Sequence, residues 1–380
     1  MQVTKLSNKI DVKQYLKNLG VDGGGVNILS SKVTQHILYI KDLHVGGANI
    51  LKQDALSVGA DLAVPRGTVL ATTPKVDAIL IATQRQLESL AKKELSQPFG
   101  LKELAQIFKD ITQVKKTKKT KIMGVINAND DSFFSGSRFE PKEAIVQIKQ
   151  MIEDGAEIID IGGVSSKPNA KLVSADEEFS RVKPIYDIIK EEKLYEKVTF
   201  SCDSYEPKVI ELALNSGFSM VNDITGLQND EVAKLCAKYN ASIVIMHMQG
   251  TPQTMQDNPE YEDVILEVYH FLEKQIQKAK DFGIKEIMVD VGIGFGKTLE
   301  DNLRLIKHLE HFKTLGCDLL VGASRKSMID TISKSSVEQR LAGTLALHLE
   351  AVENGADIVR VHDVFAHNQA LKVREALQKV

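Results

Sequence analysis

The sequence predicts an α/β protein, a (β/α)8 TIM barrel preceded by a small N-terminal α/β domain. Beyond residue 120 the chain alternates short apolar runs with longer amphipathic stretches. Runs that are nearly continuous in apolar residues are typical of parallel strands covered on both faces. Eight such strand and helix units over about 265 residues match the size and order of this barrel. A doubly wound open sheet is the alternative, but it seldom has eight units as regular as these.

The eight predicted strands follow one another along the chain. They are residues 121–127, 157–163, 198–204, 219–226, 242–247, 287–292, 318–324 and 357–363. Between them lie predicted helices such as residues 141–155, which begin with Pro141 and end with Gly155. Proline in the first turn and glycine at the end are the expected signals for helix boundaries.

The residues before the barrel predict a small α/β domain of their own over 1–113. Apolar runs at 36–40, 68–72 and 77–83 are followed by two helix-like stretches, and the glycines at 23–25 predict a turn. The basic run VKKTKKTK, which begins at residue 114, is more typical of a solvated linker than of a nucleic-acid patch. We therefore expect a linker at 114–120 and a barrel over 121–380. No catalytic constellation is recognisable in residues 1–113, so we expect that domain to pack against the barrel or to stabilise a dimer.

The composition indicates which partners and compartment to expect. With 48 basic and 51 acidic residues the formal net charge is -3, which argues against nucleic acid or an anionic membrane as the main partner. The three cysteines, Cys202, Cys236 and Cys317, are widely spaced and indicate buried thiols in a reducing compartment. No apolar run approaches the ~18 residues of a membrane span, and the first residues resemble no signal peptide. We expect a cytoplasmic protein.

The glycine-rich stretch DVGIGFGKT at 290–298 looks at first like a phosphate-binding loop. That loop needs four residues between its first glycine and the Gly-Lys pair, and here the spacing fails by one residue. The feature to follow is Asp290, a carboxylate at the end of an apolar strand.

Active sites of this fold lie where the strands end at their carboxyl side. Asp203, Asn222 and Asp290 are predicted to converge there with the ammonium of Lys326. Carboxylates accept parallel N–H bonds from an edge such as that of a 2-amino-4-oxopyrimidine, and an ammonium serves a ring carbonyl. Met246 and Phe295 are suited to packing on the faces of such a ring, although each is more often a core residue.

A second group of side chains follows the first and last strands, which are neighbours when a barrel closes. Asn127, Arg360 and His362 stand at these ends. Such donors are typical of a phosphate or pyrophosphate site. The pattern predicts transfer at a carbon whose leaving group is that anion.

The signatures at the strand ends resemble, in order, those of the dihydropteroate synthases, the folate-pathway family targeted by sulfonamides. They read MGVINANDDSFFSGS, DIGGVSSKP, CDSY, VNDITG, IMHMQGTPQTMQ, DVGIGFGKT, GASRKS and RVHDV, over roughly residues 121–364. The resemblance implies condensation of 6-hydroxymethyl-7,8-dihydropterin pyrophosphate with p-aminobenzoate, giving 7,8-dihydropteroate and pyrophosphate, with Mg²⁺. It also implies a homodimer acting on small-molecule substrates.

The same resemblance implies a role for each site residue. The pterin would be read by Asp203, Asn222, Asp290 and Lys326, with Met246 and Phe295 packing on it. The pyrophosphate would be held by Asn127, Arg360 and His362, with Asn127 also serving the metal. The p-aminobenzoate pocket would include Phe133, Ser166, Lys167, Pro168 and Ser327. The catalytic groups would be Asp203, Lys326, Arg360 and His362.

The chain departs from the family pattern in two loops. The first reads NDDSF at 129–133 where Thr-Pro-Asp-Ser-Phe is usual, and the second reads VSSKP at 164–168 where Glu-Ser-Thr-Arg-Pro is usual. Lysine keeps the charge of arginine but not its planar fork. Two alternatives therefore stay open, namely a corrinoid-linked methyltetrahydrofolate methyltransferase and a catalytically silent barrel that only binds pterin. The motifs SRKS and RVHDV favour the synthase.

Overall fold

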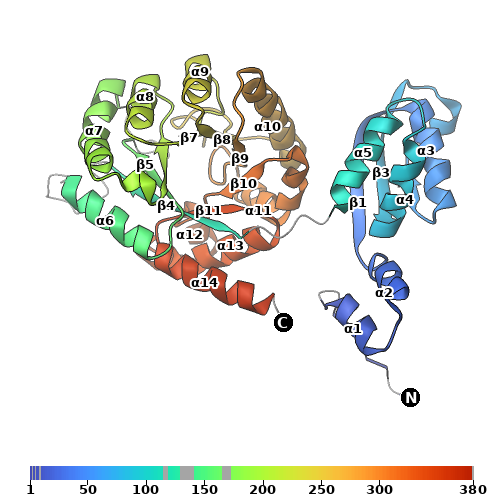
Figure 1. Ribbon diagram of the computed structural model, residues 1–380. Helices are drawn as coiled ribbons and strands as arrows, with labels where there is room; N and C mark the ends of the chain where they lie inside the picture. The colour runs from blue at the N-terminus through green and yellow to red at the C-terminus, as the bar shows by residue number, and fades with distance from the viewer. Residues whose placement is uncertain are drawn as a thin grey trace. The chain divides into compact units, whose positions relative to one another are not determined.

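The computed structural model describes residues 1, 3, 4, 6, 7, 10–113, 119–128, 141–164 and 173–378. Contacts within the chain divide it into two compact units, Met1–Thr117 and Lys118–Val380. Most of the expected linker, 114–118, lies outside the described residues. Each unit has its own sheet and its own hydrophobic core (Figure 1).

The first unit contains an antiparallel sheet with strand order β1-β3-β2. Its elements are α1 (Val12–Asn18), α2 (Gly23–Ser30), β1 (Gln35–His44), α3 (Val45–Ser57), β2 (Asp61–Ala63), β3 (Lys75–Thr83), α4 (Gln84–Glu94) and α5 (Leu101–Thr112). Alternate residues of β3, such as Ala78, Leu80 and Ala82, pack with the helices in one core that includes Leu51 and Phe108. A small α/β domain therefore precedes the barrel, as the sequence predicted.

Two local expectations for the first unit were wrong. The apolar run at 68–72 forms no strand: Thr68–Leu70 is a short 3-10 helix, and Gly67 and Ala71 on either side of it are left-handed. The glycines at 23–25 form no turn but the first residues of α2, because the Asp22 side chain accepts the Gly25 N–H at 2.9 Å. A good N-cap outweighs the low helix propensity of glycine here.

The second unit is a closed barrel of parallel strands in the order β10-β11-β4-β5-β6-β7-β8-β9. The strands are β4 (Lys121–Asn127), β5 (Ile158–Gly162), β6 (Thr199–Asp203), β7 (Met220–Asp223), β8 (Ser242–Met246), β9 (Ile287–Asp290), β10 (Asp318–Val321) and β11 (Ile358–Val361). Every one lies within a predicted strand. Closure through β11 and β4 makes the last and first strands neighbours, as expected.

Helices lie around the barrel and connect the strands (Figure 1). They are α6 (Pro141–Glu153), α7 (Ala175–Glu191), α8 (Pro207–Asn215), α9 (Asp230–Tyr239), α10 (Val264–Asp281), α11 (Leu299–Lys307), α12 (Ser327–Ile332), α13 (Leu341–Glu353) and α14 (Val364–Leu377). Outward side chains of the strands form one continuous core with these helices. No helix in the described part of the chain is long and apolar enough to cross a bilayer.

The barrel interior is filled by a separate apolar cluster. Its members are Met123, Ile158, Met220, Val244, Met288, Leu320 and Ile358, one from each strand except β6. On the outer side of β4, a Cβ at Gly124 would lie 2.8 Å from Met151 and 3.1 Å from Val364. A glycine at this position therefore lets α6 and α14 approach the strand closely. The filled interior leaves polar chemistry to the ends of the strands.

Glu94, at the end of α4, provides a test of the first unit. Its side chain is fully buried, and neither carboxyl oxygen has a hydrogen-bond partner among the described residues. Burial, reinforced by the Asp54 carboxylate, raises the pKa of Glu94 to about 7. A raised pKa means that the folded state favours the protonated form of Glu94. The contribution of this proton to the stability of the fold is therefore fully present below about pH 4.5 and is lost as the pH rises through 7.

Glu94→Gln is therefore expected to stabilise this unit at pH 8, by about 1–3 kcal/mol, and to change little at pH 4. Amide hydrogen exchange across α4 measures the difference. The exposed Glu88→Gln on the same helix is the matched control. Equal protection in wild type and Glu94→Gln at pH 8 would contradict the expectation.

Candidate active site

The predicted site residues stand together at the carboxyl ends of the strands. Asn127, Asp203, Met246 and Asp290 are the last residues of β4, β6, β8 and β9. Asn222 and Arg360 each lie one residue before the end of β7 and β11. Neighbouring parallel strands bring these ends to one rim.

The centre of the rim is a guanidinium held by two carboxylates. Arg360 donates from Nε to Asp160 Oδ2 at 2.7 Å and from Nη2 to Asp203 Oδ2 at 2.5 Å. Asn222 Nδ2 also donates to Asp160 Oδ2, at 3.0 Å. Asp160 is fully buried, and its Oδ1 has no hydrogen-bond partner within the described parts of the chain. Arg360, which was predicted to hold pyrophosphate, therefore contacts Asp203, which was predicted to read the pterin.

Asp160 was not among the predicted site residues. It lies inside β5, in the run EIIDIGG, and looked like a strand residue followed by glycines. A charged residue within an otherwise apolar strand was the signal available in the sequence, because charge is buried only where it is paired.

The ionisation of Asp203 depends on opposing effects. Burial raises the pKa of Asp203 to about 7, Arg360 opposes that rise and Asp160 adds to it. The close contact with Arg360 favours the carboxylate form. Asp203 is thus an acceptor whose charge is balanced by the guanidinium.

Asp290 lies in a similar buried position at the end of β9. Its Oδ1 accepts the Gly292 N–H at 2.7 Å. Burial raises the pKa of Asp290, while the Gly292 N–H and the nearby Lys326 lower it. A Cβ at Gly292 would lie 1.9 Å from the His247 carbonyl oxygen, so only glycine fits this close approach of the two loops.

The two apolar residues predicted to pack on the pterin lie close to each other. Met246 and Phe295 belong to one small cluster with Ile224 and Met255. Lys326 Nζ lies 4.1 Å from the centre of the Phe295 ring. Burial and the charge of Arg360 together lower the pKa of Lys326 to about 8. The rim therefore combines an apolar face with an ammonium and buried acceptors.

Lys297, the lysine of the glycine-rich stretch, contacts the loops that follow β8 and β9. Its Nζ contacts Phe295 O at 2.9 Å, His247 Nδ1 at 3.0 Å and His247 O at 3.3 Å. The side chain is buried, so it does not extend toward a solvent-borne phosphate. The three contacts account for the three donors of an ammonium. This lysine ties the loop after β8 to the loop after β9.

Asp223, the last residue of β7, serves its own loop. Its Oδ1 accepts from Thr225 N at 2.8 Å and from Thr225 Oγ1 at 2.6 Å, and its Oδ2 accepts from Leu227 N at 3.0 Å. With both oxygens used in this way, Asp223 holds the turn after β7.

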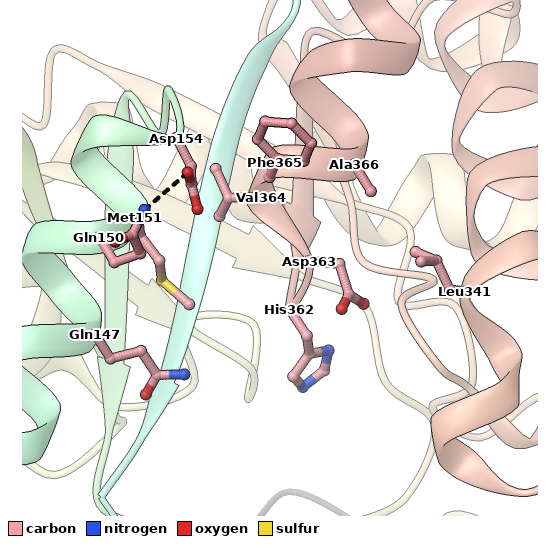
Figure 2. A pocket seen from close by; sticks show the side chains of 10 residues that line it. All are labelled: Gln147, Gln150, Met151, Asp154, Leu341, His362, Asp363, Val364, Phe365 and Ala366. Atoms are coloured by element: carbon pink, nitrogen blue, oxygen red, sulfur yellow. Dashed lines mark hydrogen bonds between the residues drawn. The ribbon is translucent and has the colours of Figure 1, made fainter.

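His362 follows β11 and contacts Ser324 at the end of the neighbouring strand, with Nδ1 and Oγ 2.9 Å apart. Burial and the charge of Arg360 together lower the pKa of His362 to about 4. The lowered pKa favours the neutral form of the imidazole near pH 7. His362 also lines a cavity of about 380 Å³ between α6 and the start of α14 (Figure 2).

Four of the predicted p-aminobenzoate residues, Phe133, Ser166, Lys167 and Pro168, lie outside the described residues. The fifth, Ser327, is exposed at the start of α12. The loop before it is held by Arg325, which is left-handed with φ +56° and pairs with both carboxylate oxygens of Asp363. This pair fixes the backbone that presents Lys326 and Ser327.

Comparison with known proteins agrees with this geometry. Residues 123–362 match the family of pterin binding enzymes. The chain is 39% identical over 377 residues to the bifunctional dihydropteroate synthase/dihydropteroate reductase of Helicobacter pylori, a match that covers 99% of each chain. It is 42% identical over 262 residues to the dihydropteroate synthase of Haemophilus influenzae, across 67% of this chain and 93% of that one. The dihydropteroate synthase of Xanthomonas albilineans with 4-aminobenzoic acid matches with a TM-score of 0.64 at 36% identity, across 69% of this chain and 94% of that one.

The fold and the rim thus define a barrel enzyme of the transferase class that acts on small molecules. The chain belongs to the pterin-binding enzymes, and within them to the dihydropteroate synthases. The family that its motifs predicted is confirmed. Its product is dihydropteroate, the compound that gives the family its name.

Proposed function

We propose that the rim divides the condensation of dihydropterin pyrophosphate with p-aminobenzoate among three groups of side chains. Asp203, Asn222 and Asp290 accept from the polar edge of the pterin, and Lys326 donates to its carbonyl. The single observation that carries this assignment is the convergence of acceptors from β6, β7 and β9 beside one ammonium, with Asn222 and Asp290 buried and the Asp203 side chain 11% exposed. The cluster of Met246 and Phe295 offers an apolar surface for the ring.

Arg360 connects the pterin to the leaving group. Its Nε and Nη2 hold Asp160 and Asp203, and Nη1 makes no hydrogen bond to another described residue. The guanidinium can therefore donate from Nη1 to pyrophosphate without releasing the carboxylates. His362, being neutral, contributes a hydrogen bond and no charge.

The reaction proceeds by departure of pyrophosphate followed by attack of the amine. The C–O bond of the pterin methylene breaks, and its electron pair leaves with pyrophosphate. The delocalised pterin cation is stabilised by the Asp203 and Asp290 carboxylates. The aniline nitrogen then forms the C–N bond and releases one proton to water. The site supplies electrostatic stabilisation, and no strong base is needed.

Mg²⁺ fits this site only as a partner of the pyrophosphate. The described residues contain no group of three or more His, Cys, Asp or Glu that would hold a metal ion by themselves. Asn127 at the end of β4 offers one amide oxygen, and magnesium commonly keeps water and substrate phosphate oxygens as its other ligands. When bound, the ion would neutralise charge on the leaving pyrophosphate.

The test is release of pyrophosphate by the purified chain, with and without p-aminobenzoate and Mg²⁺. Dihydropteroate formed only when p-aminobenzoate is present is the expected result, and it would show that the loops NDDSF and VSSKP support the reaction. Chelation of Mg²⁺ is expected to reduce the rate. Pterin binding without product would favour a silent barrel or methyl transfer instead.

A second activity, reduction of dihydropteroate, is proposed for the first unit. The Helicobacter pylori relative, named for both activities, matches this chain over both units, whereas the Haemophilus influenzae synthase matches only 67% of it. Reduction adds a hydride and a proton, so the assay supplies reduced nicotinamide dinucleotide with and without a flavin. Full-length chain is expected to reduce dihydropteroate, and residues 118–380 alone to retain only synthesis. No reduction by the full-length chain would exclude the second activity.

A homodimer is also proposed, through α14. Phe365, Val373 and Leu377 are each more than half exposed and lie along one side of this helix. An apolar stripe of this kind is typical of a contact surface. Light scattering is expected to give the mass of two chains, and Val373→Asp that of one.

A further inference from the structure

Ser324 and His362 lie side by side because their strands are neighbours. Ser324 is three residues beyond β10, and His362 directly follows β11. The two strands pair in parallel, with Leu320 opposite Ile358 and Val321 opposite Val359. The serine is buried, so its hydroxyl depends on protein partners.

The serine hydroxyl makes two contacts, both with the same histidine. The His362 backbone N–H donates to Ser324 Oγ at 3.3 Å, and His362 Nδ1 lies 2.9 Å from that oxygen. A hydroxyl has one proton to donate, and no other acceptor for it is found among the described residues. If Nδ1 carried a proton, the serine hydrogen would be buried without a partner. Donation from Ser324 to Nδ1 satisfies every group.

The charges around the ring add a second restriction. Burial opposes protonation of His362, and so do the neighbouring cations, although one anion favours it. These charged neighbours are Arg360, Arg325, Lys326 and, as the anion, Asp363. The ring therefore carries a single proton. With Nδ1 acting as an acceptor, that proton is on Nε2.

We propose that Ser324 is a positioning residue that fixes His362 in the Nε2–H form, so that the neutral ring donates to the departing pyrophosphate. The imidazole projects from the loop between β11 and α14 as one of the side chains that line the cavity (Figure 2). This inference rests on the role proposed above for His362. It adds which nitrogen donates and which residue decides it.

The first test is the tautomer itself. Long-range proton–nitrogen correlation spectra of ¹⁵N-labelled protein distinguish Nε2–H from Nδ1–H, and the His362→Gln spectrum identifies the signals of this ring. Wild type is expected to show Nε2–H only. Ser324→Ala is expected to introduce Nδ1–H, and Ser324→Thr, which keeps the hydroxyl, to restore the wild-type form. Nδ1–H in the wild type would overturn the proposal.

The second test separates this role from a merely structural one. Ser324→Ala is expected to weaken pyrophosphate binding about tenfold. It should leave the affinity for the hydroxymethyl pterin, which lacks pyrophosphate, unchanged. Ser333→Ala, in the exposed loop after α12, is the matched control. Equal loss for both ligands would indicate a disturbed loop and overturn the proposal.

His362→Gln distinguishes the failure of this inference from failure of the proposed function. If pyrophosphate affinity falls in His362→Gln but not in Ser324→Ala, the histidine is used and the serine does not position it. If neither variant changes the affinity, His362 has no part in holding pyrophosphate, and the role proposed for it fails as well.

Discussion

Replacing Asp290 with asparagine is expected to weaken binding of dihydropterin pyrophosphate by about 100-fold or more. Asp290 Oδ1 already accepts the Gly292 N–H at 2.7 Å, which leaves Oδ2 for the substrate. Asparagine has one oxygen and one NH₂ group. Whichever way the amide is turned, one of these N–H donors meets another donor in a buried site, and an unpaired buried donor is costly.

Calorimetric titration with the pterin pyrophosphate measures this loss. Asp281→Asn makes the same chemical change at the exposed end of α10, away from the rim, and is expected to bind normally. A dissociation constant that is unchanged in Asp290→Asn would remove Asp290 from the pterin site.

Arg360→Lys is expected to lower kcat/KM by about 10²- to 10⁴-fold. Arg360 holds Asp160 and Asp203 at once through two different nitrogens, and its planar fork still has Nη1 for the anion. A lysine ammonium is a single point charge and cannot reproduce this geometry. Because the charge of Arg360 opposes the effect of burial, Arg360→Gln, which removes that charge, is also expected to raise the pKa of Asp203 further above its ordinary value.

Steady-state kinetics of pyrophosphate release give the size of the effect, with Arg374→Lys as the control, because Arg374 of α14 pairs with Glu353 of α13. The double variant Arg360→Gln/Asp160→Asn distinguishes activity lost through misfolding from activity lost because Arg360 is missing from the site. Arg360→Gln alone leaves both Asp160 and Asp203 without their cation, and removing the fully buried Asp160 carboxylate as well avoids the costlier of these two unpaired charges. The double variant is therefore expected to recover thermal stability and not activity. Recovery of both would reduce Arg360 to a structural role.

Most of the barrel could be predicted because its signals are local. Nearly continuous apolar runs of six to eight residues predicted the strands to within a few residues, as at β4, which matches its predicted range of 121–127. The ends of the strands were harder to predict, since the last residues of a strand are set by hydrogen bonds to the neighbouring strands. In the first unit, the run at 68–72 had the composition of a strand but no neighbouring strand with which to pair.

The site residues were predictable where position alone decides. Parallel strands place their carboxyl ends at one rim, so residues such as Asp203 and Asp290 could be placed from the sequence. The ionisation state of His362 could not, because it depends on burial and on cations from its own strand and from the loop after β10. The buried contacts of Lys297 with His247 and Phe295 could likewise not be predicted, because the motif around this lysine resembles a phosphate loop.

The sequence by itself determined the order of the elements, the eight strands that a closed barrel of this kind needs and the family. It also determined which end of the barrel carries the chemistry. Only the tertiary structure decided which of those side chains hold one another. Asp160 and Arg360 are 200 residues apart, and Ser324 and His362 are 38 apart. Their bonds exist because the closed barrel brings side chains from strands far apart in the sequence within about 3 Å of one another, where burial makes every unpaired polar group costly. Periodicity along the chain follows backbone geometry, whereas these pairings depend on distances across the barrel that no local pattern encodes.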